Sequence, residues 1–342
     1  MDTIKVGIVG CGLMGSLHAR TLHTLPGVQV TAVHNRTRGK AEALAKEVGA
    51  TVYDTYEELL QQDLDAVWVA TPDHLHVDIS KAVLDSGKHL FLEKALATSV
   101  SDGAEIVAAG DRRPELKAMV GYPLRFDPRF RKMKEIVAQE GAGKPLQGWS
   151  MRTHFLDPNA RVYDKYRDHY YDTPSWYFDD QNAKGPVFSH GSHDYDLLMW
   201  MCGEVESVFC YGGTYLLPPG SVADAFTVSL RFKNGGIGQV STPWITRVEY
   251  DMTGVATENL TVMNNNGEIR VKSGNEPEQR ITYSENDMWV QLNQHFIDCI
   301  RYDRQPLISL QDGLNVIAVS EAAYKSLKER REVFVETGGA LV

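Results

Sequence analysis

Residues 1–122 alternate short apolar runs with segments that carry apolar residues at helical spacing. The apolar runs read IKVGIVG, VQVTAVH, DAVWVA, KHLFLE and LKAMVGY. Strands that alternate with helices need crossover connections, so they form a parallel sheet that is covered on both faces. The sequence therefore predicts an α/β fold with a doubly wound parallel sheet in residues 1–122.

A different pattern follows residue 122. The segment AFTVSLRFKNGGIGQVSTPW alternates apolar and polar residues around a turn at residues 234–236, and NLTVMNNNGEIRVKSG repeats this form around Asn266-Gly267. Such turns between alternating runs are typical of antiparallel hairpins. We therefore expect a second, α+β domain in residues 123–342 with an open, mostly antiparallel sheet and a final helix at about residues 311–331.

Charge and cysteine usage exclude several classes of partner. The formal net charge is −10, which argues against nucleic acid or an anionic membrane as the main partner because both require clustered Lys and Arg. The four cysteines are scattered without CxxC spacing, which is typical of reduced thiols in a cytoplasmic protein. We also expect no signal peptide and no membrane span.

The stretch VGIVGCGLMGSLHARTL places Gly10, Gly12 and Gly15 directly after a predicted strand and at the start of a predicted helix. Glycines at this spacing allow a tight turn, a close approach of the backbone to a pyrophosphate, and close packing of helix on strand. Since the surrounding βα units agree with the motif, we expect dinucleotide binding here, with Leu13 and Met14 as further cofactor-binding candidates.

The end of the second predicted strand bears on the choice of cofactor. An NAD site usually has a carboxylate about 20 residues after the glycines, but this chain has Asn35, followed by Arg36 and Thr37. Arg36 could pair with a 2′-phosphate, which favours NADP slightly. The alternative is a solvated arginine, with Asn35 binding NAD through neutral hydrogen bonds.

The stretch HLFLEKALATS places Lys94 at the carboxyl end of the fifth predicted strand. Doubly wound sheets bind ligands at that edge. A lysine serves as a base for a substrate hydroxyl only if desolvation lowers its pKa toward neutrality, as burial beside a nicotinamide would. The alternative is a lysine that caps a strand end at the surface.

Five segments in order, VGIVGCGLMGSLHA, DAVWVATPDHLH, GKHLFLEKALA, GSHDYDLLMW and DGLNVIAVSEAAYKSL, together resemble the glucose–fructose oxidoreductase, inositol dehydrogenase and rhizopine catabolism (Gfo/Idh/MocA) family. The resemblance implies a Rossmann domain followed by an α/β domain with an open sheet that often forms a dimer or tetramer surface. It also implies oxidation or reduction of sugars, polyols and related alcohols with NAD or NADP.

The resemblance assigns roles to individual residues. EKA matches the family's Glu-Lys-Pro motif, which makes Lys94 the expected proton donor or acceptor and Glu93 a neighbour of the cofactor. HGSHDYD matches the family's Asp-x-Gly-x-x-x-x-Asp pattern, in which His193 assists catalysis and Asp196 is the last residue. The loop ATPDHLH matches the family's cofactor loop, with candidates Thr71, Pro72 and His76.

Two residues depart from the family pattern. Ser189 stands where the family has an aspartate, and the loss of that charge should leave Lys94 easier to deprotonate, unless Asp194 or a remote carboxylate substitutes. Ala95 stands where the family has a proline that commonly follows a cis bond. Since a non-proline cis bond costs about 3–4 kcal/mol, we expect a trans bond between Lys94 and Ala95.

Residues 152–184 show little periodicity and many aromatic residues, which suits the faces of a sugar ring. The alternative is a loop that pins itself to the sheet or to another subunit. Arg152, Arg161 and Arg167 could hold an anionic group on a substrate. His190 and His193 lack a third ligand at recognisable spacing, so we expect no metal. The further substrate-binding candidates are Tyr122, Arg125, His154, Trp176, Ser189 and His190.

The leading hypothesis is a cytoplasmic, homodimeric or homotetrameric NAD(P)-dependent oxidoreductase that acts on a sugar, anhydrosugar or polyol. The first alternative is a redox-neutral lyase or glycosidase that oxidises a sugar hydroxyl transiently. The second alternative is a dinucleotide-binding regulator without activity. The presence of both Lys94 and His193 weighs against the regulator.

Overall fold

The chain divides into two compact units in the computed structural model. The first unit contains Met1–Phe126 and Asn286–Asn315, and the second contains Asp127–Glu285 and Val316–Val342. This division differs from the single boundary after residue 122 expected above, because residues 286–315 return to the first unit. The structure describes residues 3–156, 161–164, 169–172, 175–178, 184–284 and 286–336, without the side chains of 161–164, 169–172, 175 and 176.

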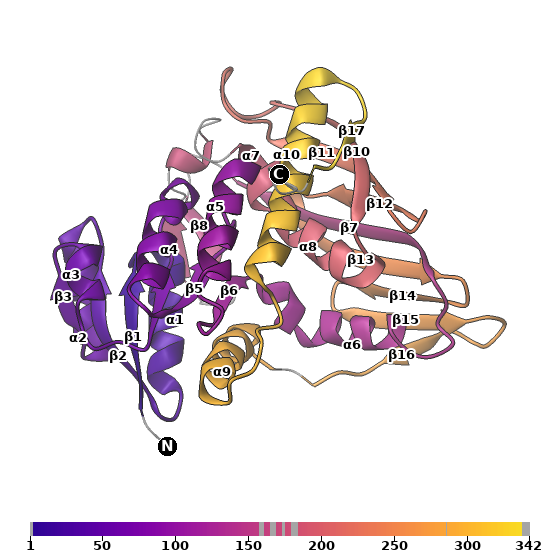
Figure 1. Ribbon diagram of the computed structural model, residues 1–342. Helices are drawn as coiled ribbons and strands as arrows, with labels where there is room; N and C mark the ends of the chain where they lie inside the picture. Colours follow the sequence, from indigo (N-terminus) through magenta and orange to yellow (C-terminus); the bar gives the residue numbers. More distant parts are fainter. Residues whose placement is uncertain are drawn as a thin grey trace. The chain divides into compact units, whose positions relative to one another are not determined.

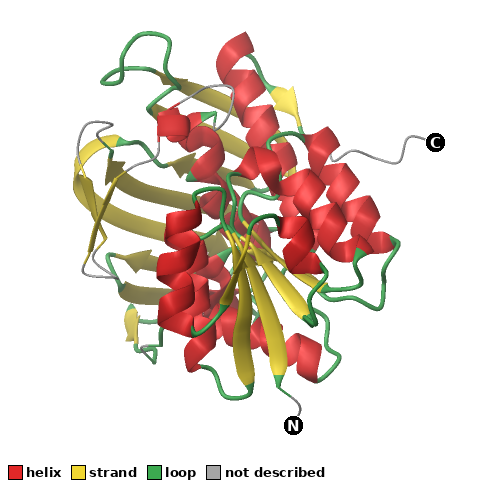
Figure 2. Cartoon of the chain, turned by 90° about the vertical axis from the view of Figure 1, so that its left-hand side faces the viewer, coloured by secondary structure: helices red, strands yellow, loops and turns green. Residues whose placement is uncertain are grey.

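The first unit is built on a six-stranded parallel sheet (Figure 1), which confirms the doubly wound architecture expected from the alternating pattern. The central strands are almost completely buried, whereas the edge strand β3 is not. Helices lie on both faces of the sheet (Figure 2). From edge to edge the strands are β3 (Thr51–Tyr53), β2 (Val28–His34), β1 (Ile4–Val9), β4 (Ala66–Val69), β5 (His89–Glu93) and β6 (Ala118–Gly121).

The strand order of this sheet reverses between β1 and β4, where loops at the carboxyl ends of the strands diverge and leave room for a ligand. Side-chain caps start two of its helices, since Thr55 accepts from Glu58 N and Ser99 accepts from Asp102 N. The helices and 3₁₀ turns of this unit are α1 (Leu13–Thr24), α2 (Arg38–Val48), α3 (Tyr56–Leu60), η1 (Asp73–Leu75), α4 (His76–Asp85), α5 (Val100–Asp111), η2 (Pro123–Phe126) and α9 (Met288–Arg301).

Helix α9 belongs to the first unit because its inner face completes an aromatic core. The rings of Trp68 and Phe91 stack at 5.3 Å, and Phe296 of α9 lies 5.3 Å from the first ring and 5.7 Å from the second. All three side chains are fully buried. Burial of aromatic rings of this size contributes several kcal/mol, so α9 packs here despite its distance in sequence.

The second unit is built on a nine-stranded sheet whose described neighbours are antiparallel, apart from the parallel pair β7 and β12. The hairpins predicted around residues 234–236 and Asn266-Gly267 are confirmed, with positive φ at Gly235, Asn266 and Gly267. From edge to edge the strands are β16 (Gln279–Ile281), β15 (Glu268–Ser273), β14 (Leu260–Asn265), β13 (Ile245–Thr257), β7 (Pro145–Phe155), β12 (Ile237–Ser241), β11 (Ala225–Phe232), β10 (Val205–Gly213) and β17 (Val333–Phe334).

Helices of the second unit pack on one face of this sheet, with α6 against β14 and α8 against β7 and β12 (Figure 1). The last helix covers residues close to those predicted, and its first residues fall in the first unit. A separate two-stranded sheet joins β8 (Arg161–Asp164) and β9 (His169–Asp172). The helices and turn are α6 (Pro128–Val137), η3 (Ser175–Phe178), α7 (Gly185–Ser189), α8 (Gly191–Cys202) and α10 (Leu310–Glu329).

Candidate active site

The three glycines between β1 and α1 have different reasons to be glycine. Gly10 has a φ of +99°, and a Cβ there would lie 2.4 Å from the carbonyl oxygen of Ala70. A Cβ on Gly15 would lie 1.7 Å from the carbonyl oxygen of Gly10. A Cβ on Gly12, the N-cap of α1, would meet no described atom within 4 Å. Gly10 and Gly15 therefore serve chain packing, whereas Gly12 leaves open space before the N–H groups of a helix, which suits a pyrophosphate.

The end of β2 is tied to this loop through Asn35. Its Oδ1 accepts a hydrogen bond from Cys11 N at 2.9 Å, and its Nδ2 donates to the Thr37 carbonyl at 3.0 Å. The side chain of Asn35 therefore holds the glycine loop in place. Arg36 is exposed and forms no ion pair with a described residue, whereas Arg38 is paired with carboxylates of the same unit.

The loops after β4 and β5 are joined by His76, which is fully buried. Its Nδ1 lies 2.8 Å from the Ala95 carbonyl oxygen, and its Nε2 lies 3.0 Å from the Thr71 carbonyl oxygen. Since both partners are acceptors, both ring nitrogens donate when the imidazole is protonated. His76 thus positions the loop of Thr71 and Pro72 against the residues that follow Lys94.

The peptide bond between Lys94 and Ala95 is cis, so the expectation of a trans bond is wrong. That expectation weighed only the intrinsic preference of the peptide. In the folded chain the backbone is held on both sides of this bond, because Glu93 Oε2 accepts from Lys94 N at 3.1 Å and His76 binds the Ala95 carbonyl. Ala95 is also buried, at 1% exposure. The alanine therefore keeps the geometry for which the family uses proline.

Sequence reasoning missed two buried partners of the Glu93-Lys94 turn. His18 Nε2 lies 2.7 Å from Glu93 Oε1, and His18 Nδ1 lies 3.1 Å from Asn293 Oδ1. His18 stands on the inner stripe of α1 with Gly15, so its position in a helical pattern could have indicated burial. No local signal connects it with Asn293, which lies 275 residues away.

Asp73 is a carboxylate of the first unit that interacts electrostatically with Lys94. Desolvation raises the pKa of Asp73, while the charges of His76 and Lys94 favour its ionised form and that of Glu93 opposes it. The sequence analysis left open a remote carboxylate as a substitute for the missing aspartate at position 189. Asp73, in the loop after β4, is a remote carboxylate that interacts with Lys94.

Asp194, the other substitute considered, is enclosed in the second unit. Its side chain is fully buried and accepts from Ser150 Oγ at 2.6 Å, Arg152 Nε at 2.7 Å and Thr242 Oγ1 at 2.7 Å. Although burial alone would lower it, the pKa of Arg152 is raised by Asp194. Arg152 is thus paired within the second unit, and only 13% of its side chain is exposed.

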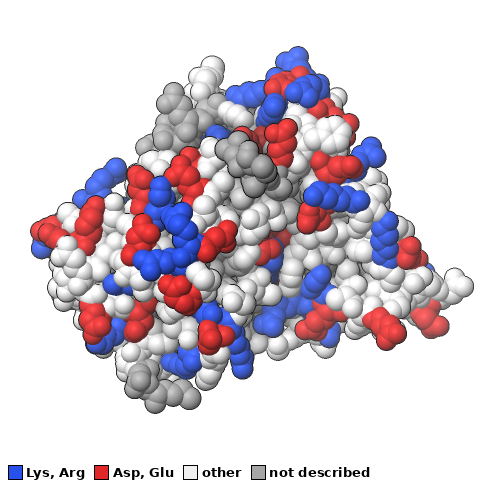
Figure 3. Space-filling model, viewed as in Figure 1, with Lys and Arg blue, Asp and Glu red and all other residues white. Residues whose placement is uncertain are grey.

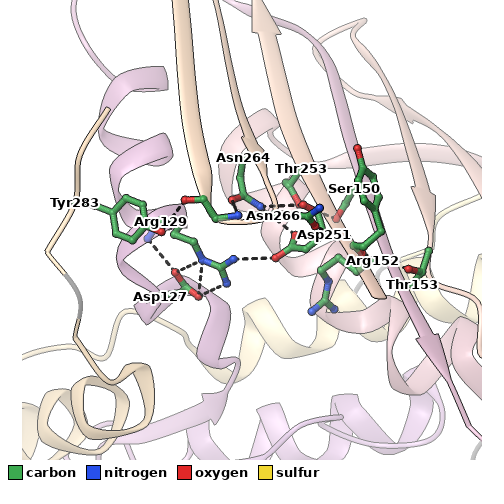
Figure 4. Close-up of polar contacts among 12 residues, drawn as sticks. Asp127, Arg129, Ser150, Arg152, Thr153, Asp251, Thr253, Asn264, Asn266 and Tyr283 are labelled. Carbon is green, nitrogen blue, oxygen red and sulfur yellow. Dashed lines mark hydrogen bonds and ion pairs between the residues drawn. The ribbon is translucent and has the colours of Figure 1, made fainter. Parts of the chain in front are cut away.

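A polar layer continues from this pair across the sheet of the second unit (Figure 4). Ser150 on β7 reaches Thr253 on β13 at 3.1 Å between hydroxyl oxygens. Arg129 joins Asp127 to Asp251, and its Nη1 lies 2.9 Å from Asp251 Oδ2. These side chains therefore satisfy one another's hydrogen-bonding groups within the second unit.

The candidates on α7 and at the start of α8 form an aromatic and polar group. Ser189 Oγ donates to the Gly185 carbonyl at 3.1 Å and lies 3.4 Å from His190 Nδ1. Trp244 Nε1 donates to the same Nδ1 at 2.9 Å, and the ring of His154 lies 5.1 Å from that of His190. The structure thus brings His154, Ser189 and His190 together, with Trp244 as a partner that the sequence did not indicate.

The remaining candidates occupy varied environments. Tyr122 is fully buried in the first unit, and Arg125, which is 5% exposed, lies 3.4 Å from Asp312 Oδ1. His193 is half-buried on α8 in the second unit, and Asp196 is fully buried there. Leu13 is exposed beside Met14 at the start of α1. The side chains of Trp176, Arg161 and Arg167 lie outside the described residues.

Three further properties bear on possible partners. Among the described residues, no three His, Cys, Asp or Glu side chains are placed to hold a metal ion. Within the same residues, no helix has the length and apolar character needed to cross a membrane. Basic and acidic side chains are intermixed over the face drawn in Figure 3.

Two family models match the chain in succession. Residues 4–122 match the model described as oxidoreductase family, NAD-binding Rossmann fold. Residues 130–270 match the model described as GFO/IDH/MocA C-terminal domain. The two matches together extend over well more than half of the chain.

Individual relatives agree with these models. Myo-inositol 2-dehydrogenase of Thermotoga maritima is 24% identical over 97% of this chain and 99% of that protein. Inositol 2-dehydrogenase 1 of Saccharopolyspora erythraea is 32% identical, but the alignment covers 58% of this chain and only 54% of that protein. The solved structure of levoglucosan dehydrogenase in complex with NADH has a TM-score of 0.87 at 19% identity and covers 98% of this chain and all of its own. The last comparison establishes the fold.

Proposed function

Because this chain belongs to the Gfo/Idh/MocA family of oxidoreductases, we propose that it transfers a hydride between a nicotinamide cofactor and a hydroxyl or keto carbon of a sugar, anhydrosugar or polyol. The names of its inositol dehydrogenase relatives support the substrate class. The observation that carries the proposal is the placement of Lys94 at the carboxyl end of β5, in a turn held by Glu93 and His76.

Lys94 is the acid/base of the proposed reaction. In the direction of oxidation its neutral amine accepts the proton of the substrate hydroxyl, and in the direction of reduction its ammonium returns that proton. A bound nicotinamide accepts or supplies the hydride. The space at Gly12 and the N-terminus of α1 suit the pyrophosphate. The resemblance of HGSHDYD to the family motif supports an assisting role for His193.

The test is the Lys94→Ala variant. We expect turnover to fall by roughly 10²–10⁴-fold, the usual contribution of general acid–base catalysis, while cofactor affinity persists. Lys81→Ala is the matched control, because Lys81 is an exposed lysine of the same unit that pairs with Glu105. Turnover that survives in Lys94→Ala removes the lysine from this role.

Arg36 favours NADP as the cofactor. Its exposed guanidinium forms no ion pair with a described residue, and the neighbouring Asn35 carries no charge that would repel a 2′-phosphate. We expect Arg36→Ala to weaken NADPH binding by up to about fivefold and leave NADH binding nearly unchanged, as measured by fluorescence titration. Equal effects on NADPH and NADH binding would show that Arg36 is a solvated residue that does not bind the 2′-phosphate.

One observation favours the redox-neutral alternative. Ser189 stands in place of an aspartate, and its hydroxyl is directed to the Gly185 carbonyl of its own helix. Altered chemistry at that position fits a lyase or glycosidase that returns the hydride to its substrate. Absorbance of the reduced nicotinamide distinguishes the two reactions, because it changes steadily with turnover only in a dehydrogenase.

The sheet of the second unit is the proposed surface for a homodimer or homotetramer. Large apolar side chains are exposed on its strands, at 70% for Tyr211, 55% for Ile237 and 63% for Phe334. Apolar side chains of this kind mark an interface where they form one contiguous patch. Light scattering coupled to size exclusion would measure a mass of two or four chains, and Ile237→Lys should lower it.

A further inference from the structure

A buried chain of hydrogen bonds runs from the aromatic core of the first unit to the Glu93-Lys94 turn. Trp68 Nε1 donates to Asn293 Oδ1 at 2.9 Å, and His18 Nδ1 lies 3.1 Å from the same oxygen. His18 Nε2 lies 2.7 Å from Glu93 Oε1, and Glu93 Oε2 accepts from Lys94 N at 3.1 Å. His18 and Asn293 are fully buried, and Glu93 is 5% exposed.

The positions of the protons in this series of hydrogen bonds follow from its two outer partners, one of which can only donate and the other only accept. Trp68 Nε1 can only donate and the Trp289 carbonyl can only accept, so the amide of Asn293 points its oxygen to the indole and its nitrogen to the carbonyl. The oxygen of Asn293 must then accept from His18, which places a proton on His18 Nδ1. The orientation of the amide thus determines the tautomer of the histidine.

With Nδ1 protonated, the short contact between His18 Nε2 and Glu93 Oε1 holds one further proton. If that proton lies on the ring, an imidazolium faces a carboxylate. If it lies on the carboxyl group, a neutral imidazole faces a neutral acid. Both arrangements have a net charge of zero, and the apolar surroundings of His18 beside Phe91 and Trp289 favour a neutral pair.

We propose that His18 is a positioning residue that neutralises Glu93, so that the carboxylate adjoining Lys94 in sequence holds the lysine backbone without adding negative charge to its site. This inference rests on the acid/base role proposed for Lys94. An unpaired carboxylate beside an amine stabilises the ammonium form and would keep the lysine from acting as a base. The shared proton prevents this while Glu93 still binds Lys94 N.

Other charges around Lys94 come from the loop after β4 and the start of α4. Asp73 interacts with Lys94 and Glu93, and it also interacts with His74 and His76. The interactions of Asp73 with His76 and with Lys94 both favour its ionised form, and the ring of His76 lies between the Ala95 and Thr71 carbonyl oxygens. Of the described carboxylates, Glu93 therefore contacts His18, and Asp73 interacts with His76.

The test measures the protonation of Lys94 without relying on turnover. The folded wild-type protein and its variants are treated with an amine-reactive reagent over a range of pH, and modification of Lys94 is quantified by mass spectrometry. In His18→Gln the amide can donate to Glu93 but carries no charge, so the carboxylate remains ionised. We expect the midpoint of Lys94 modification, and of kcat/KM, to move up by roughly one pH unit or more.

Two matched variants separate charge from structure. Glu93→Gln keeps the hydrogen-bonding positions and a neutral pair, so the midpoint should stay at the wild-type value. The double variant His18→Gln with Glu93→Gln is also neutral, and its midpoint should return from that of His18→Gln to that of the wild type. A His18→Gln midpoint equal to that of the wild type, or a shift that persists in the double variant, overturns the inference. Turnover that survives in Lys94→Ala instead overturns the acid/base role proposed for Lys94, and the modification data still decide whether His18 neutralises Glu93.

Discussion

An alanine at position 15 would place its methyl carbon 1.7 Å from the carbonyl oxygen of Gly10 and 2.9 Å from the carbonyl carbon. Both obstructing atoms belong to the backbone of the loop that precedes α1, so they cannot rotate away as a side chain would. To reach an ordinary contact, the helix and the loop must separate by more than 1 Å. Overpacking of a well-packed interior usually costs about 1–3 kcal/mol, and we expect Gly15→Ala to lie at or above the upper end of that range.

An alanine at position 12 meets no described atom within 4 Å, and the φ of −78° suits any residue. Because alanine lowers the backbone conformational entropy of the unfolded chain, Gly12→Ala should leave the free energy of unfolding unchanged or raise it by about 0.4–1 kcal/mol. The added methyl group nevertheless projects into the space before the N-terminus of α1. The two substitutions are therefore expected to affect different properties. Gly15→Ala lowers the stability of the fold, and Gly12→Ala lowers the affinity for the cofactor.

Thermal unfolding without cofactor measures the first effect, and fluorescence titration with NADH and NADPH measures the second. Gly39→Ala is the stability control, because a Cβ at Gly39 is also unobstructed. A Gly12→Ala variant with wild-type affinity would show that the pyrophosphate does not occupy this space. A Gly15→Ala variant as stable as the wild type would refute the packing argument.

Three further predictions concern buried groups. Asp194→Ala should cost about 3–5 kcal/mol in urea unfolding because it removes the fully buried partner of Arg152, whereas Asp63→Ala, in an exposed pair, should cause no measurable loss. Since the folded-state pKa of Asp73 is raised, its stabilising effect is full below its ordinary value of 3.8 and is lost as pH rises through the raised value. Asp73→Asn should therefore raise the melting temperature at pH 7 and leave it unchanged at pH 3. Burial raises the pKa of three thiols to about 12 and of the fourth to about 11, so iodoacetamide at pH 8 should label the native protein far more slowly than the urea-unfolded protein. These four thiols are Cys11, Cys202, Cys210 and Cys299.

Features with a local physical cause could be predicted from the sequence alone. The alternation of strands and helices, the glycine loop at Gly10 and the two hairpin turns each depend on residues that are close together in the chain. Periodicity and backbone conformation act over a few residues, so a pattern in the sequence is enough to indicate them. The placement of Lys94 at the end of β5 follows from the same local pattern.

Features that depend on distant contacts were decided only by the tertiary structure. Asn293 comes from α9, far along the chain, yet it determines the tautomer of His18, and the cis bond after Lys94 lies in a backbone that His76 and Glu93 hold from either side. A local pattern carries the intrinsic preference of each residue but not the partner that folding brings to it. In a buried site that partner decides where protons and charges lie, because desolvated polar groups must be paired.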